Sequence, residues 1–255
     1  MAIGLGIGIG IPSGVLNSNA AEAVSYYYYN GDGSGLINFD LNNEGLPILD
    51  DSNIQAAVNA YLNGDLDDIE LWDVSNVTSM YRLFQDATEF NQDISSWNVS
   101  NVTNMSSMLF NATSFNQDIS NWDVSNVINM ASMFYSATSF NQPIGNWDVS
   151  NVFSLGFMFY NATSFNQPIG NWDITNITSE YNGYFMPGVT LSAANYDNLL
   201  IGWAAKMLVA YPGGSGYSIS PSWNFGNSVH TIGGDAETAK NTLVNTFNWT
   251  ITDAN

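Results

Sequence analysis

The residues that acid–base or nucleophilic catalysis needs are almost absent from this chain. It has no cysteine and a single histidine, His230, in the stretch Ser-Val-His-Thr. A serine nucleophile needs a base within hydrogen-bond reach, and one isolated histidine fits a loop or strand position in a C-terminal cap better. The carboxylates of Asp50–Asp51 and Asp67–Asp68 are adjacent in sequence and diverge, whereas glycosidases need facing pairs. Because no phosphate-binding glycine loop is present either, the sequence predicts a protein that is not an enzyme.

A periodic series of carboxylates has the chemistry of a metal site. At one position of a 25-residue period, with Asn98 interrupting the series, the chain carries Asp73, Asp123, Asp148 and Asp173. Carboxylate oxygens suit Ca²⁺, and like charges at strand spacing repel unless something screens them. Two interpretations stay open: an acidic face screened by water and salt, or a weak Ca²⁺ site. The segment from Asp40 to Asp51 matches an EF-hand loop poorly, because Pro47 interrupts it. No other cofactor is expected.

A row of aromatic side chains suggests recognition of a ligand. Phe110, Tyr135 and Tyr160 occupy one position of the same period, and Phe153 and Phe157 add bulk where earlier repeats have smaller or polar residues. Exposed aromatic side chains on a rigid scaffold suit contact with a protein or a glycan. The alternative, that these rings belong to the core, is equally compatible with the sequence.

The charge balance excludes two classes of partner. The 255-residue chain has 23 acidic and 3 basic residues, and its net charge is −20. Nucleic acids and anionic membrane surfaces are bound through Lys and Arg, which this chain cannot supply. Because 45% of the residues are hydrophobic and 14% aromatic, the chain can fold around a sizeable core and is not a disordered acidic tail.

A 25-residue repeat positions all of these candidates. Its clearest marker is tryptophan, at Trp72, Trp97, Trp122, Trp147 and Trp172. Around Trp122 and Val124 the spacing predicts a short strand with both side chains inward and Asp123 outward. The next apolar residues, from Val127 to Phe134, follow at helical spacing and predict a return helix or 3₁₀ turn. The asparagines of the repeat are expected to bridge neighbouring units by hydrogen bonds; they are Asn76, Asn101, Asn126, Asn151 and Asn176.

This organisation predicts an α/β repeat fold, a leucine-rich-repeat-like solenoid of about four to five 25-residue coils with helical caps. Helices are expected from a capping box at Ser52–Gln55, from an N-cap at Ser192 and from about Asp235. Strands are expected at 217–219 and 249–251. The predicted division is an N-terminal docking segment, an N-terminal region with a cap, the repeats and a C-terminal α/β cap, at residues 1–16, 17–71, 72–188 and 189–255.

The repeat motifs resemble those of a known family. The chain reads WDVSNVTSM from Trp72, WNVSNVTNM from Trp97 and FNQDIS from Phe90. These motifs are similar to those of BspA-like leucine-rich-repeat surface proteins over residues 72–179, with weaker similarity at 191–203 and 249–253. The resemblance implies adhesion or surface recognition, in bacterial envelopes or in phage particles, and it brings no catalytic residues.

The N-terminus predicts assembly. Large apolar residues alternate with glycine at Ile3, Leu5, Ile7, Ile9 and Ile11. A strand of this kind has one apolar and one bare face, so it is expected to pair with another chain. No Lys or Arg precedes Arg82, so a secretory signal is not expected, and the apolar run is too short to insert in a membrane.

These features predict an accessory virion (phage) protein with a structural and a recognition role. It is expected to be exposed on the particle and anchored by its N-terminus. Its expected partner is a protein, either a copy of itself or a virion or envelope component, within a homo-oligomer or larger assembly; a glycan is a further candidate ligand. The alternative is a bacterial surface adhesin, on the cell surface or extracellular, that binds a protein or glycan.

Overall fold

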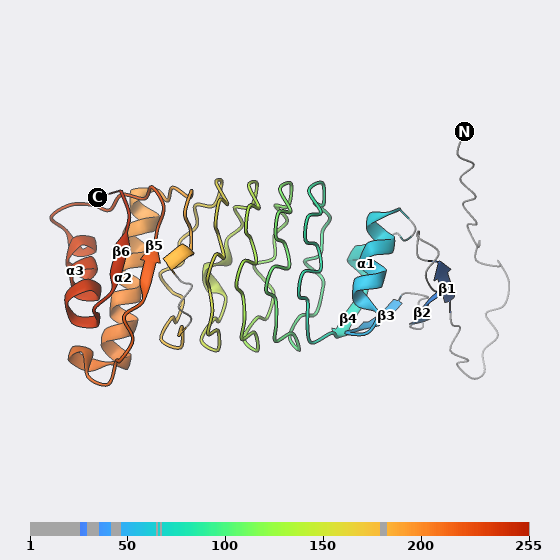
Figure 1. Cartoon of the computed structure of the whole chain (residues 1–255), viewed down its shortest axis with the longest axis horizontal. Helices are drawn as coiled ribbons and strands as arrows, with labels where there is room; N and C mark the ends of the chain where they lie inside the picture. Colours follow the sequence, from blue (N-terminus) through green and yellow to red (C-terminus); the bar gives the residue numbers. More distant parts are fainter. Residues whose placement is uncertain are drawn as a thin grey trace.

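Four short strands at the start of the described chain form one sheet. The structure is a computed structural model that describes residues 26–29, 36–41, 47–64, 66, 68–178 and 183–254. The strands are β1 (Tyr26–Tyr29), β2 (Leu36–Leu41), β3 (Pro47–Asp50) and β4 (Asp73–Asn76). They lie in the order β1-β2-β3-β4, the first two pairs antiparallel and the last parallel (Figure 1). The expected assembly residues Ile3, Leu5, Ile7, Ile9 and Ile11 lie outside the described residues, so their pairing stays a prediction.

The helix α1 (Ile54–Leu62) follows β3 in the chain and precedes β4, and it covers the start of the repeats (Figure 1). Ile54, Ala57 and Val58 are buried and form the apolar face of this helix. The ring of Tyr61 meets Trp72 edge-on, with 5.9 Å between ring centroids. The helix therefore packs its apolar side against the first aromatic residue of the repeats.

The start of α1 differs from the expected capping box at Ser52–Gln55. The N-cap residue is Asn53, and no side chain caps the helix. Instead, Asn53 Oδ1 accepts a hydrogen bond of 2.9 Å from the backbone N–H of Asp50, which closes the turn before the helix. Asp51 is the last residue of the segment that was compared with an EF-hand loop. It accepts hydrogen bonds from the backbone N–H groups of Thr78 and Ser79. Asp51 therefore connects this turn to the first repeat.

The expected α/β fold, a leucine-rich-repeat-like solenoid of four to five coils with helical caps, is wrong. In the described part of the chain there are few helices, and the short strands form only two small sheets. Within the repeats the elements are β4, the 3₁₀ turns η1 (Ile69–Leu71) and η2 (Ile144–Asn146), and single bridges such as Asn104–Asn129. The described repeats lack the strand and return helix in each unit that define the expected class.

Left-handed backbone conformations explain why no return helix forms between Val127 and Phe134. Ser132 and Ser136 have φ angles of +59° and +54°, and a right-handed helix cannot continue through such residues. The equivalent residues of the neighbouring repeats are also left-handed: Arg82, Asp86, Ser107, Asn111, Phe157 and Asn161. The chain instead forms consecutive turns, and alternate N–H groups donate to the next repeat, as from Ser132 to Gly156 O at 2.9 Å.

The expected strand around Trp122 is also absent, although its side chains point as expected. Trp122 and Val124 are buried and Asp123 is exposed. The backbone turns here, with Val127 N–H donating to Val124 O at 2.9 Å. Asp123 Oδ1 accepts hydrogen bonds from both the N–H and the hydroxyl of Ser125, which stabilises the turn. Alternation of burial is therefore compatible with a turn as well as with a strand.

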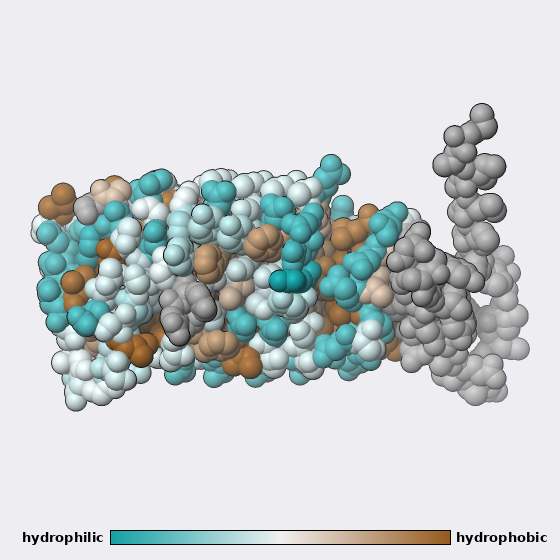
Figure 2. All heavy atoms as spheres, in the orientation of Figure 1, coloured by the Kyte–Doolittle hydropathy of each residue, from teal (hydrophilic) through white to brown (hydrophobic). Residues whose placement is uncertain are grey.

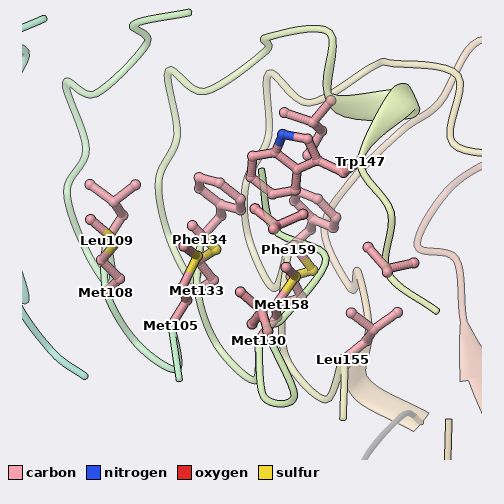
Figure 3. Close-up of a cluster of buried hydrophobic side chains, with 14 of the residues drawn as sticks. Met105, Met108, Leu109, Met130, Met133, Phe134, Trp147, Leu155, Met158 and Phe159 are labelled. Carbon is pink, nitrogen blue, oxygen red and sulfur yellow. The ribbon is translucent and has the colours of Figure 1, made fainter. Parts of the chain in front are cut away.

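Buried side chains of neighbouring repeats form a continuous core. Figure 3 shows methionines at one repeat position, Met108, Met133 and Met158, beside Phe134 and Phe159. The rings of Phe134 and Phe159 stack with centroids 5.6 Å apart. The tryptophan indoles donate from Nε1 to isoleucine carbonyls of the preceding repeat, at 2.8–3.2 Å in Trp97, Trp122, Trp147 and Trp172. Each repeat thus binds its predecessor through apolar packing and a buried polar contact.

The C-terminal part contains two packed helices and a small parallel sheet (Figure 1). The elements are α2 (Ala193–Ala210), η4 (Pro212–Gly214), β5 (Ser222–Asn224), α3 (Asp235–Phe247) and β6 (Thr250–Thr252). Both helices were expected, and Ser192 caps α2 as predicted by accepting from Asn195 N–H. The first expected strand is wrong, because β5 begins at Ser222 rather than at 217; β6 overlaps the second expected strand.

The helix α2 replaces a further repeat. Trp203 Nε1 donates to Ile169 O at 3.1 Å, which repeats the tryptophan contact of the preceding units. Gly170 and Gly202 let the two backbones touch, since a Cβ on Gly202 would overlap the carbonyl oxygen of Gly170. Close packing at these two glycines therefore allows α2 to cover the core of the last repeat.

The surface mixes polar and apolar residues. On the face shown in Figure 2, hydrophilic and hydrophobic side chains are interspersed over the repeats and the C-terminal part. Among the described residues, no helix is long and apolar enough to cross a membrane.

Candidate recognition surface

Three rings predicted from their common repeat position stack on one another. Phe110 and Tyr135 lie 4.4 Å apart between ring centroids at an interplanar angle of 9°, and Tyr135 and Tyr160 lie 4.7 Å apart at 3°. We call these three residues the aromatic ladder. All three are half-buried, so neither alternative left open by the sequence holds alone. The rings pack on one another and still reach the surface.

Beyond the aromatic ladder, the series of neighbouring rings continues with Phe157 and Tyr184. The ring of Phe157 lies 6.2 Å from that of Tyr160 and stacks on Tyr184 at 4.7 Å and 2°. Phe157 has a φ angle of +60°, a conformation that costs about 1 kcal/mol or more for a bulky residue. Tyr184, which sequence reasoning missed, has 52% of its surface exposed. It lies 25 residues after the buried Phe159, so the period predicts a core position for it rather than a place in this series of rings.

Phe153 occupies a different repeat position from the ladder and is 43% exposed. Ile128, the equivalent residue of the preceding repeat, is 48% exposed, and the Phe153 N–H donates to its carbonyl at 3.0 Å. The structure therefore divides the five predicted binding residues: four belong to one connected series of rings, and Phe153 lies beside Ile128.

Mutual stacking decides which parts of the ladder rings remain available. At 4.4 and 4.7 Å, both faces of Tyr135 are covered by its neighbours. Its accessible part is therefore a ring edge with the phenolic hydroxyl, and a sugar cannot stack on its face. Stacked rings also have little rotational freedom left to lose on binding. The ladder thus presents rigid aromatic edges and hydroxyl groups.

The predicted acidic series is held by local hydrogen bonds. Asp73, Asp148 and Asp173 each accept from the backbone N–H of the residue two positions later, at 2.9–3.0 Å, as Asp123 does at 3.1 Å. Two hydrogen bonds from Ser125 lower the pKa of Asp123; the bond from the side-chain hydroxyl has the larger effect and the bond from the backbone N–H the smaller one. No group of three or more metal-binding side chains occurs among the described residues. A Ca²⁺ site on this series stays a prediction.

Removing one of these hydroxyl groups should be visible in a titration. Ser125→Ala is expected to raise the pKa of Asp123 towards its ordinary value, because the strongest stabilising contact of the carboxylate is lost. Because the pKa of Asp123 is lowered in the folded protein, its carboxylate stabilises the fold above about pH 4. This stabilisation is lost as the pH falls through the folded-state pKa of Asp123. The Ser125→Ala variant has less of it to lose and should therefore unfold at a slightly higher pH than wild type. Carboxyl chemical shifts followed by NMR measure the change. Asp118, whose hydrogen bonds come from Ser120, is the internal control and should not shift.

Two members of the acidic series share a hollow with a cation. A cavity of about 430 Å³ is lined by Asp148, Asp173 and Lys206. Hydrogen bonds from Ser150, and to a lesser extent the charge of Lys206, lower the pKa of Asp148. The lysine partly screens the carboxylates here, which weakens the need for a bound metal ion.

His230, the histidine considered for catalysis, is buried in the C-terminal part, whereas Asp67 lies outside the described residues. His230 is 6% exposed, and its ring meets Tyr196 edge-on at 6.2 Å. Tyr196 donates its hydroxyl to Asp253 at 2.6 Å, and Asp253 pairs with Lys240 at 2.8 Å. These contacts hold the end of the chain against α2 and α3. That the protein is not an enzyme stays a prediction from the sequence.

Four of the five repeat asparagines bridge neighbouring units as expected, namely Asn101, Asn126, Asn151 and Asn176. Their Nδ2 groups donate to serine carbonyls 26 residues earlier at 2.6–2.8 Å, although the side chains are exposed rather than buried. A second series was missed: Asn116 N–H donates to Asn91 Oδ1 at 2.9 Å, and Gln117 Nε2 donates to Asn91 O at 2.8 Å. The recurring FNQ motif was the available signal for these contacts.

The repeats and the segment before them match a known family. A family profile described as "Mycoplasma protein of unknown function, DUF285" matches residues 52–172 and, in a second overlapping match, residues 97–194. Together these matches span more than half of the chain. The chain belongs to the DUF285 family. The DUF285 matches include the aromatic ladder and Tyr184 and end within the first turn of α2, so α3 lies beyond them. No curated protein and no solved structure matches this chain.

Proposed function

We propose that this protein is a non-enzymatic surface protein that recognises a partner through the aromatic ladder. The observation that carries the proposal is the face-to-face stacking of Phe110, Tyr135 and Tyr160, half-buried and 4.4–4.7 Å apart. Tyrosine and other aromatic side chains dominate the binding energy of many protein interfaces when they are rigidly held. The ladder meets this condition, because its neighbours already order each ring.

A protein partner fits the ladder better than a glycan. Sugars bind aromatic residues mainly across the ring face, and both faces of Tyr135 are occupied. Ring edges and hydroxyl groups suit an interface of mixed polarity instead. The net charge of −20 favours a partner with basic residues and opposes nucleic acid.

The resemblance to BspA-like surface proteins and the DUF285 membership support a place on an exposed surface. We place the protein on a virion, as an accessory phage protein anchored by its N-terminal Gly/Ile segment. The alternative is a bacterial surface adhesin, which the same resemblance supports. Antibodies against residues 72–178, with immunogold microscopy of purified particles and of cells, distinguish the two. Label confined to the cytosol contradicts both.

Substitution of the ladder should remove binding while the fold is kept. The double variant Tyr135→Ala/Tyr160→Ala is expected to bind intact cells or isolated envelopes of candidate bacterial hosts at least about tenfold more weakly than wild type, as for interface hot spots. Flow cytometry with the fluorescently labelled full chain measures this. Val209→Ser, which changes an 83%-exposed residue of α2, is the matched control and should bind normally. Equal binding by all three proteins contradicts the proposal, and competition by free glycans would instead indicate a glycan ligand.

A further inference from the structure

One face of the repeats uses the same four hydrogen-bond donors in unit after unit. Thr113 Oγ1 and Ser114 N–H donate to Thr88 O at 3.0 and 3.1 Å. Asn116 N–H and Gln117 Nε2 donate to Asn91 Oδ1 and O at 2.9 and 2.8 Å. The next repeat makes the equivalent four bonds from Thr138, Ser139, Asn141 and Gln142. Each unit therefore offers a donor set to the unit before it and an acceptor set to the unit after it.

The C-terminal end of this series is closed by α2 and the residue before it. Ser192 N–H donates to Asn166 Oδ1 at 2.8 Å, and Asn195 Nδ2 donates to Asn166 O at 2.7 Å. These two groups reproduce the contacts of the repeat asparagine and glutamine. A segment of different sequence thus supplies the donors to Asn166, so this part of the pairing does not require another repeat.

Among the described residues, the N-terminal end of the series has no such partner. The donors of the first unit are Thr88 Oγ1, Glu89 N–H, Asn91 N–H and Gln92 Nε2, and none of them has a hydrogen-bond partner among the residues that the structure describes. All four residues are exposed. We call them the open edge. An unpaired row of donors with fixed geometry is a template for an added chain segment.

A hollow beside the open edge adds a place for a side chain. Its volume is about 520 Å³, and it lies between the end of α1 and residues 86–92. Its apolar lining comes from Tyr61, Leu62, Leu66 and Phe90. Asp86 and Glu89 also line the hollow, and their negative charges make an acidic occupant unfavourable.

We propose that the open edge binds an extended, non-acidic peptide segment of a partner protein. The segment supplies backbone carbonyl and asparagine or glutamine oxygens to the four donors, and it places one apolar side chain in the hollow. The internal repeats define this chemistry, because each donor set already binds a stretch of the form Thr-x-x-Asn. The binding mode resembles strand addition, in which main-chain hydrogen bonds give affinity and a pocket gives specificity. This surface is separate from the aromatic ladder, so the proposal does not depend on the proposed function.

A peptide taken from the repeat itself is the direct probe. A fluorescein-labelled synthetic peptide with the sequence of residues 136–146, SATSFNQPIGN, carries the required acceptors and no charged side chain. Fluorescence polarisation with the full chain should show saturable binding, and a scrambled peptide should not bind. Gln92→Glu replaces a donor by an acceptor and is expected to weaken binding at least about tenfold. Val209→Ser should bind as wild type does. Absence of saturable binding, or binding that Gln92→Glu leaves unchanged, overturns the proposal.

A matched pair of variants tests whether the edge is open in the folded protein. Gln117→Glu loses the bond to Asn91 O and places a carboxylate against a carbonyl, so its melting temperature should fall by about 2–6 °C. Gln92→Glu is the same chemical change at the open edge, where no bond is lost, and should shift the melting temperature by no more than about 1 °C. Thermal unfolding by circular dichroism measures both. Equal losses of stability would show that Gln92 is already paired and would refute the open edge.

Discussion

Trp122→Ala is expected to lower the free energy of unfolding by about 3–5 kcal/mol, the usual effect of emptying an aromatic core position. Trp122 is 4% exposed, and its indole Nε1 donates to Ile94 O at 3.1 Å. Alanine leaves a cavity between two repeats and removes one of the two hydrogen bonds to Ile94 O, which keeps the bond from the Trp97 N–H. Because each repeat packs directly on its neighbours, the loss affects two interfaces at once.

Two further variants separate packing from hydrogen bonding at this site. Trp122→Phe keeps an aromatic ring but removes the donor, so it should cost less than Trp122→Ala while remaining measurable. Val209→Ala, at an 83%-exposed residue, should change stability by less than about 0.5 kcal/mol. Chemical denaturation measures all three. A cost for Trp122→Ala no larger than that of Val209→Ala would contradict the packing described for the tryptophans.

Gly202→Ala is expected to destabilise the contact between α2 and the last repeat by about 1–3 kcal/mol or more. The added Cβ overlaps the carbonyl of Gly170, which is backbone and cannot move away as a flexible side chain would. In an exposed helix the same change would be stabilising, because alanine is the better helix former. The sign of the effect therefore reports the close approach itself.

Gly234→Ala is the matched control for Gly202→Ala. At Gly234 the φ angle is negative, and the nearest atom to an added Cβ is a methyl of Thr231 at 4.0 Å. Gly234 is the N-cap residue of α3, where alanine is less favourable than glycine, so this variant should lose only about 0.5–1 kcal/mol, without any backbone overlap. If Gly202→Ala were as stable as wild type, α2 could not lie against Gly170 as described.

The stacking of the aromatic ladder was predictable from the sequence, and its exposure was not. Phe110, Tyr135 and Tyr160 share one position of a 25-residue period, so they were expected to form one column. Whether such rings face the core or the solvent depends on the backbone that carries them. Tyr184 illustrates the same limit, because it is exposed and stacks on Phe157 although it lies 25 residues after the buried Phe159.

The turns between the repeats could not be predicted, for a physical reason. The apolar spacing from Val127 to Phe134 suits a helix, and serine at position 132 does not by itself indicate a positive φ angle. The left-handed residues are selected by hydrogen bonds to the next repeat, such as Phe134 N–H to Met158 O at 2.9 Å. Local spacing contains no information about that partner. The end helices were predictable because their apolar stripes are complete within one segment.

The open edge was invisible in the sequence because Gln92 and Gln117 occupy the same motif. Both belong to FNQDIS stretches, and only the structure shows that the Gln117 amide is paired, whereas the Gln92 amide has no partner in the part of the chain that the structure describes. The difference arises from position alone: Gln117 has a complete repeat before it, whereas Gln92 follows the segment containing α1. Terminal units of repeat proteins commonly differ from internal ones in this way.

Photocrosslinking from the aromatic ladder tests the central claim most directly. The photoreactive analogue p-benzoylphenylalanine is introduced as Tyr135→p-benzoylphenylalanine and, as the control, as Val209→p-benzoylphenylalanine. Each full-length variant is irradiated on intact host cells or envelopes to which the wild-type protein binds. The account predicts one discrete protein adduct from position 135 and none from position 209. Bound protein that gives no adduct from position 135 would contradict the assignment of the ladder as the recognition surface.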